Sequence, residues 1–238
     1  MVIKMDIFYG VLINAGLVIL GSCAGLILQK FTKVKQIGER IFQAFALFVM
    51  VMGIQGVELS HPLYFLICLV IGIAIGELLD IDKQFNRFGS FVENKFARNS
   101  GGWNFAEGFV TASLLFCIGS MTFLGAIESG MQHQHTIYTT KGIIDAVSAL
   151  TLTMGAGISV AFSAVSILVY QGLLVLGANV LAPIMTEETI AMCVSVGSLS
   201  LVAIGFNMLA MSKIKVANML PAMFIPMIWQ AIQLIIAK

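Results

Sequence analysis

The chain has 238 residues, of which 59% are hydrophobic and only 11% are charged, and its formal net charge is +1. A soluble domain carries about 25% charged residues, so this composition excludes an ordinary soluble globular protein. A net charge this small also gives no basic surface for a phosphate backbone, so we expect no nucleic-acid partner.

Long apolar stretches follow one another along the whole chain. A bilayer-spanning helix needs about 20 mostly apolar residues. The stretch 146–185 contains no charged residue and is about twice that length, so we expect two helices there, joined by a turn near 157–163. The sequence therefore predicts an all-α, polytopic transmembrane helix bundle, a single domain over 1–238 with about eight spans: 10–29, 41–57, 63–79, 108–127, two in 146–185, 189–210 and 219–237.

Basic residues alternate from loop to loop in this arrangement. Lysines and arginines gather in the loops after the first, third and seventh spans: Lys30, Lys33, Lys35, Arg40, Lys83, Arg87, Lys95, Arg98, Lys213 and Lys215. Loops rich in lysine and arginine stay in the cytoplasm. We therefore expect a protein of the bacterial cytoplasmic (inner) membrane with both termini outside.

The segment 82–98 has a different pattern from the spans. Phe85, Phe88, Val92 and Phe96 recur at helical spacing, and charged residues fill much of the rest. This pattern predicts an interfacial amphipathic helix that lies on the inner leaflet. The alternative is a helix that faces water and packs on the end of the bundle.

An internal repeat fits the loop charges in two ways. Spans one to three and six to eight each form a group of three helices, and the charge rule gives the two groups opposite orientations, as in inverted repeats. A parallel repeat of four plus four helices fits the same charges. Neither scheme has strong sequence identity.

Small and polar residues line up on several predicted spans. Ser113 and Ser120 share one face of the span 108–127, and Thr111 lies on the opposite face, so we expect this helix to be central. Ser148 and Thr151 share a face of the next helix, and Asn14 belongs to a stripe of small residues on the first. Each stripe alone is explained by helix packing, but together they favour a polar path.

Charged side chains are expected only near the helix ends. A coupled transporter usually has an acidic residue or a histidine within the membrane. Asp145 is the best candidate because it begins the polar stripe of the fifth helix, although Lys141, one turn earlier, is in register for a simple helix-end ion pair. With the amide of Asn207, the candidate substrate-path residues are Asn14, Ser113, Ser120, Asp145, Ser148, Thr151 and Asn207.

The last predicted span contains two prolines. Pro221 suits the first turn of a helix, whereas Pro226 should remove a backbone hydrogen bond and kink the helix, freeing the carbonyl of Ala222. Kinked helices line many transporter sites.

Enzyme signatures are missing from the sequence. It contains no H-E-x-x-H zinc motif, no G-x-S-x-G nucleophile motif and no G-x-x-x-x-G-K phosphate loop. The four cysteines lie in apolar runs without the C-x-x-C spacing of a metal site. We therefore expect no catalytic activity, no metal and no cofactor.

Several segments resemble a known family. The run Gly108-Phe109-Val110-Thr111-Ala112-Ser113-Leu114-Leu115-Phe116-Cys117-Ile118-Gly119-Ser120-Met121 is similar to the signature of the domain of unknown function 554 family, a YdfK/YqgA-like family of bacterial integral membrane proteins. Asn14 with Gly16, Lys141 with Asp145, 170–172 and 213–221 are similar to its other motifs. The resemblance covers essentially the whole chain. It implies a multi-pass inner-membrane protein, sometimes suspected to be a transporter, and it carries over no catalytic or binding residues.

The leading hypothesis from the sequence is a transporter of a small solute or ion that works by alternating access. The lipid bilayer is the expected partner, with a small solute or cation as ligand. The alternative is a non-transporting membrane partner subunit or sensor that docks through 82–98. The sequence does not indicate an oligomeric state.

Overall fold

The computed structural model describes residues 6–30, 32–96 and 105–236, and every regular element among them is helical. A membrane-spanning bundle is therefore confirmed as all-α. Six segments within the described ranges are long and apolar enough to cross a bilayer: α2 (Tyr9–Gln29), Ile37–Gly56 within α3 (Thr32–Gly56), α4 (Pro62–Leu79), α9 (Ser159–Leu176), α11 (Glu187–Met208) and Val216–Ile236. A bent pair of helices would make seven.

The expected count of about eight also included a helix that is less apolar than the others. α8 (Thr136–Ala156) has 21 residues, but it is not among the segments apolar enough to count as a span. The prediction that this helix starts at the charge-free run was wrong, because α8 begins before Lys141 and Asp145 and contains both. The predicted turn is confirmed: α8 ends at Ala156, Gly157 follows with a φ of +70°, and α9 starts at Ser159.

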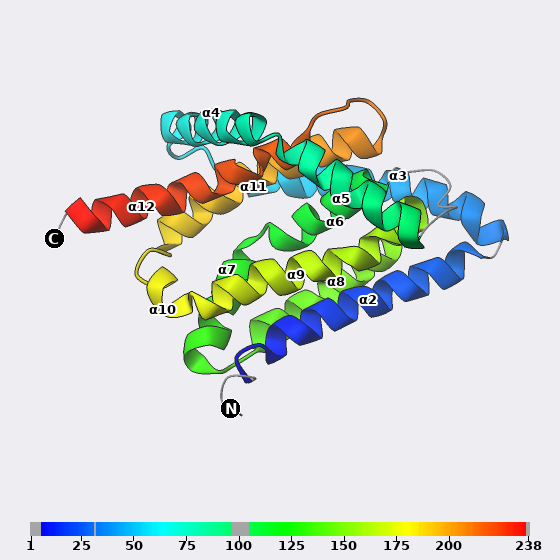
Figure 1. Cartoon of the computed structure of the whole chain (residues 1–238), viewed down its shortest axis with the longest axis horizontal. Coiled ribbons are helices and arrows are strands. Elements are labelled where there is room, and N and C mark those ends of the chain that lie inside the picture. Colours follow the sequence, from blue (N-terminus) through cyan, green and yellow to red (C-terminus); the bar gives the residue numbers. More distant parts are fainter. Residues whose placement is uncertain (1–5, 31, 97–104, 237–238) are drawn as a thin grey trace.

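The predicted fourth span, 108–127, is not one continuous helix. It consists of α6 (Phe105–Cys117) and α7 (Ser120–Ile127), which the π-helical turn η1 (Glu128–Gln132) extends, and the two halves are bent by 59°. The prediction that this helix is central is confirmed, because all but two of the 13 residues of α6 are buried. Figure 1 shows α6 and α7 between the α2, α8 and α9 side and the α3, α4 and α11 side of the bundle.

The amphipathic helix α5 (Ile81–Phe96) packs on the bundle. The rings of Phe85 and Phe109 on α6 lie 5.8 Å apart, and the backbone N–H of Asp82 donates to Asn218 Oδ1 at 2.7 Å. Part of its apolar face is therefore covered by protein, as the alternative interpretation required, and its contact with lipid stays a prediction. Residues 97 and 98 of the predicted helix lie outside the described residues.

The C-terminal span changes helix type before Pro226. The 3-10 helix η2 (Val216–Phe224) contains Pro221, and α12 (Ile225–Ile236) starts one residue before Pro226. The prediction that Pro226 frees the carbonyl of Ala222 was wrong, because this proline lies in the first turn of α12, where its missing N–H costs little, and the bend of the helix there stays a prediction. The carbonyl of Ala222 accepts from the N–H of Ile225.

Glycines bring α2 and α8 into close parallel contact. A Cβ on Gly21 would lie 2.1 Å from the carbonyl oxygen of Ala146, and a Cβ on Gly25 would lie 2.6 Å from that of Leu150. Small residues allow backbones to approach this closely within a membrane. The pairing aligns the two helices from their first turns to the amide of Gln29, which donates to the carbonyls of Thr153 and Met154 at 2.8 and 2.7 Å.

The helices run alternately between two ends of the bundle. The start of α2 and the end of α12 lie toward the same end, at the left of Figure 1, which we call the terminal end. The opposite end, where α2, α4, α8 and α11 finish, contains Lys30, Lys83, Arg87, Lys213 and Lys215, and we call it the basic end. The expected separation of charge between the two ends is therefore present in the fold.

Candidate functional site

The break between α6 and α7 exposes the ends of two helices inside the bundle. Gly119 separates the two helices, and its φ of +143° is a backbone conformation that residues with a side chain rarely adopt. The N–H of Ile118 still bonds to the carbonyl of Leu114, and that of Thr122 bonds to the carbonyl of Gly119. Helix ends have free carbonyls or free N–H groups, so such breaks form polar sites in transporters.

A buried ion pair lies beside this break. Lys141 and Asp145 on α8 contact each other directly, and the two residues are only 5% and 6% exposed. Cys117, the last residue of α6, is close enough for both charges to act on its thiol. Asp145 is near the middle of α8, so the expectation that no carboxylate lies at mid-helix was wrong. Buried charges in a membrane are costly and usually functional.

Two amides complete the buried polar cluster. Asn14 on α2 donates from Nδ2 to Gln171 Oε1 on α9 at 3.2 Å, and both residues are 0% exposed. The Asn14 side chain also interacts with the Asp145 carboxylate. Asn14 Oδ1 and Gln171 Nε2 are buried without a hydrogen-bond partner among the described residues. Such groups are costly to bury, so the cluster has unused capacity to bind a polar ligand.

The candidate residues do not form one group. Asn14 and Asp145 come together in the buried cluster. Ser113 is engaged with Ser166 of α9 at 2.8 Å, and Thr151 bonds to the carbonyl of Val147 in its own helix at 3.0 Å. Both contacts match the packing interpretation of the stripes. Ser120 is exposed at the start of α7, Ser148 is partly exposed on α8, and Asn207 lies at the basic end.

Three residues of the cluster were not among the candidates: Lys141, Cys117 and Gln171. The sequence did contain a signal for Lys141 and for Gln171. Lys141 is in i, i+4 register with Asp145, and Gln171 is an amide in an otherwise apolar helix. The sequence did not predict that α2 and α9 place Asn14 beside Gln171.

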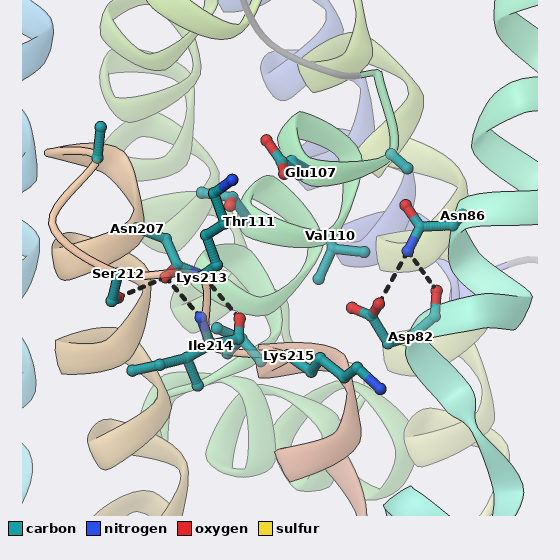
Figure 2. A pocket seen from close by; sticks show the side chains of 13 residues that line it. Asp82, Asn86, Glu107, Val110, Thr111, Asn207, Ser212, Lys213, Ile214 and Lys215 are labelled. Atoms are coloured by element: carbon teal, nitrogen blue, oxygen red, sulfur yellow. Dashed lines mark hydrogen bonds between the residues drawn. The ribbon is translucent and has the colours of Figure 1, made fainter.

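A pocket of about 260 Å³ opens at the basic end, between α5, α6 and the loop that follows α11. Figure 2 shows Asn207 at its wall: Oδ1 accepts from Ser212 Oγ at 2.7 Å and from the Ile214 N–H at 3.0 Å, and Nδ2 donates to the Ile214 carbonyl at 2.8 Å. Asn207 therefore uses its amide to shape the loop. The charged lining residues are Asp82, Glu107, Lys213 and Lys215.

One acidic group of this pocket is perturbed. Burial raises the pKa of Asp82 above its usual range, and the nearby charge of Lys215 opposes this effect. Asn86 Nδ2 donates to Asp82 Oδ2 at 2.8 Å, which helps to hold the carboxylate in place (Figure 2).

The terminal end is held together near the start of α11. His61 Nε2 lies 3.6 Å from Glu188 Oε1, and Ser195 Oγ donates to the Glu58 carbonyl at 2.9 Å. These contacts fasten the α3–α4 loop to α11. Within the described residues no group of three or more His, Cys, Asp or Glu side chains is placed to hold a metal ion.

Comparison with known proteins identifies relatives over nearly the full length. The chain is 29% identical over 223 residues to the "Uncharacterized membrane protein YdfK" of Bacillus subtilis (strain 168), covering 92% of this chain and 93% of that protein. It is 27% identical over 222 residues to the "Uncharacterized protein YqgA" of Escherichia coli (strain K12), covering 92% and 94%. No solved structure matches. A family profile described as "Protein of unknown function (DUF554)" matches residues 9–231, and the chain therefore belongs to the DUF554 family.

Proposed function

We propose that this protein is a transporter of a small solute or ion that works by alternating access, and that it is a carrier rather than an enzyme. The observation that carries the proposal is the broken helix α6–α7 beside the buried Lys141–Asp145 pair. Irregular backbone and intramembrane charge are both unfavourable in a bilayer. Their occurrence together in the centre of the bundle is what a binding site for a polar cargo requires.

The cluster offers distinct roles to its members. Asn14 and Gln171 have spare hydrogen-bonding atoms for an uncharged part of the cargo. Asp145 would exchange its bond to Lys141 for a cation, such as a proton, so that cargo binding and cation binding are coupled. Lys141 keeps the carboxylate paired when no cation is bound, which prevents an unpaired charge in the bundle.

The proposed orientation follows from the charge separation. We place the basic end, with the pocket of Figure 2, in the cytoplasm, and the terminal end outside a bacterial cytoplasmic membrane. The pocket then supplies a water-filled entry to the path from the inside.

Flux through purified protein in sealed liposomes tests the proposal. We would load the vesicles with radiolabelled sodium, rubidium, amino acids, sugars and small organic acids in turn, and follow internal pH with a trapped dye. We expect protein-dependent flux of at least one of these probes. The flux should be lost in Asp145→Asn and retained in Thr151→Val, which removes a hydroxyl bonded only within its own helix.

Two results would contradict the proposal. One is the absence of flux for every probe, with and without an imposed proton gradient, from protein that remains folded in the vesicles. The other is a flux that Asp145→Asn leaves unchanged, because the buried pair would then have no part in transport.

A further inference from the structure

The first third of the chain contains the three helices α2, α3 and α4, and the last third contains α9, α11 and the η2–α12 span. Each helix of the first group packs antiparallel to one helix of the second group. α2 meets α9 at Asn14 and Gln171. α4 meets the η2–α12 span, since a Cβ on Gly72 would touch Ala222 and a Cβ on Gly76 would touch Asn218. α3 and α11 also contact each other and run antiparallel. The first helix of one group of three therefore pairs with the first of the other, the second with the second and the third with the third.

The crossing of α3 and α11 is reciprocal. A Cβ on Gly53 would lie 2.8 Å from the backbone nitrogen of Val202, and a Cβ on Gly205 would lie 2.0 Å from Cγ of Met50. Gly205 follows Gly53 by 152 positions, and Val202 follows Met50 by the same 152, as the antiparallel course of the two helices requires. The further observation is that a glycine stands at both equivalent positions and that each glycine lets the other helix approach closely. A two-fold axis through the crossing would produce this arrangement.

The sequence repeats in the register that this crossing defines. Residues 47–55 read LFVMVMGIQ and residues 199–207 read LSLVAIGFN, with leucine, glycine and a terminal amide at equal positions. Residues 17–21 (LVILG) and 168–172 (LVYQG) match at a separation of 151. The identity is low, but a nearly constant separation across two helices is what an internal repeat requires.

We infer that α2–α4 and α9–α12 are inverted repeats related by a two-fold axis in the membrane plane through the α3–α11 crossing, and that the two repeats exchange conformations. This inference deepens the proposed function, because exchange between inverted repeats is how one binding site is opened to either side. Asn14 belongs to the first repeat and Gln171 to the second, so the polar cluster lies between the two repeats. The cluster can therefore stay in place while the two repeats exchange conformations.

The register identifies the contact that the exchanged state should form. At the terminal end, His61 is fastened to Glu188. The counterpart of His61 is Lys213, 152 positions later, and the counterpart of Glu188 is position 36, one helical turn before Glu39. Lys213 lines the open pocket, and among the described residues neither it nor Glu39 takes part in an ion pair. In the exchanged state Lys213 pairs with Glu39 while His61 separates from Glu188.

Cross-linking of introduced cysteines tests this exchange without any knowledge of the cargo. The background is Cys23→Ser, because Cys68, Cys117 and Cys193 are buried. We would compare the pair His61→Cys with Glu188→Cys, the pair Glu39→Cys with Lys213→Cys, and the control pair Glu39→Cys with Lys83→Cys, using a short bifunctional maleimide in native membranes. The control lysine is exposed at the same end but is not the counterpart of His61.

The pair at positions 61 and 188 and the pair at positions 39 and 213 should each cross-link, and cross-linking of one pair should prevent cross-linking of the other. In a variant with all four cysteines, prior closure at the terminal end should lower the yield at Glu39 and Lys213 by at least about tenfold, as expected when one of two states is locked. A yield at Glu39 and Lys213 no higher than that of the control pair would overturn the inference, and so would an equal yield in the locked protein. The flux assay is independent, so transport can fail while exchange is observed, and the reverse.

Discussion

At the scale of single residues, the buried ion pair of α8 has the largest energetic consequence. Removal of one member leaves the other charged and without a partner in the bundle, which typically costs about 3–5 kcal/mol. Replacement of both by apolar residues of similar size removes that penalty. Stability and function should therefore respond differently to single and double substitutions at Lys141 and Asp145.

We expect Asp145→Leu to lower the free energy of unfolding by about 3–5 kcal/mol and the double variant Lys141→Met/Asp145→Leu to regain most of this loss. Thermal unfolding in detergent, followed by the fraction of monodisperse protein, measures both. The control is Lys83→Met, which removes an exposed partner 3.9 Å from Asp80 and should change stability by less than about 1 kcal/mol. A double variant as unstable as the single would show that the pair is needed for folding itself.

Asp82 makes a pH-dependent contribution at the basic end. Its pKa is raised in the folded protein by burial, so the folded state holds the proton more tightly than the unfolded state does. Stability from this group is therefore complete below the unfolded pKa of about 3.9 and falls as pH rises through the folded pKa. We expect Asp82→Asn to melt at a higher temperature than the unchanged protein at neutral pH, with the difference disappearing at pH values below about 4. A difference that is constant with pH would contradict the assigned cause.

At the scale of helices, the contact between α2 and α8 depends on a residue without a side chain. Gly21→Ala should lower the free energy of unfolding by at least about 2 kcal/mol, because its Cβ would lie 2.1 Å from a backbone oxygen that cannot move without displacing α8. Gly16→Ala on the same helix meets nothing within 4 Å and should be neutral or slightly stabilising. Melting curves of the two variants in the same detergent compare them directly, and equal melting points would refute the close approach of the helices.

The break between α6 and α7 depends on the backbone conformation of Gly119. Alanine at φ +143° is strained by about 1–3 kcal/mol, so Gly119→Ala should favour a straighter helix. We expect the variant to insert and fold but to lose most of the flux that the unchanged protein supports. Liposome flux, normalised to the amount of folded protein, provides the measurement, with Gly16→Ala as the reference. Normal flux in Gly119→Ala would mean that the break has no role in transport.

The sequence predicted helices better than it predicted their interruptions. Apolar length alone located α2, α4 and α11 to within a few residues. It missed the break at Gly119 because one glycine in an apolar run is compatible with either a continuous or a broken helix. It also placed the start of α8 too late, since charge normally ends a span and only the partnership of Lys141 with Asp145 allows the helix to include both.

At the scale of the whole molecule, the orientation of the basic end can be measured. Reporter enzymes active on one side of the membrane, fused between α5 and α6 and within the loop after α3, should report opposite sides, with the fusion after α5 in the cytoplasm. Cytoplasmic activity from the α3 loop instead would reverse the orientation and place the pocket of Figure 2 outside.

Only part of the candidate site could be predicted from the sequence, because the rest depends on how the helices pack. Asp145 and Asn14 could be recognised as polar residues in apolar helices, but their proximity depends on the pairing of α2 with both α8 and α9. Ser113 and Thr151 carry the same sequence signal, yet they satisfy their hydroxyls in ordinary helix contacts. Residue type identifies the groups that need a partner, and only the fold decides which of them lack one.

The hydrogen bond from Asn14 to Gln171 also constrains the biogenesis of the protein. The two residues are 157 positions apart. At about 5–20 residues per second, the ribosome takes roughly 10–30 s to make the second after the first. During that interval α2 enters the bilayer with an amide whose partner does not yet exist. The newly inserted helix therefore carries an amide without this partner until the last third of the chain arrives.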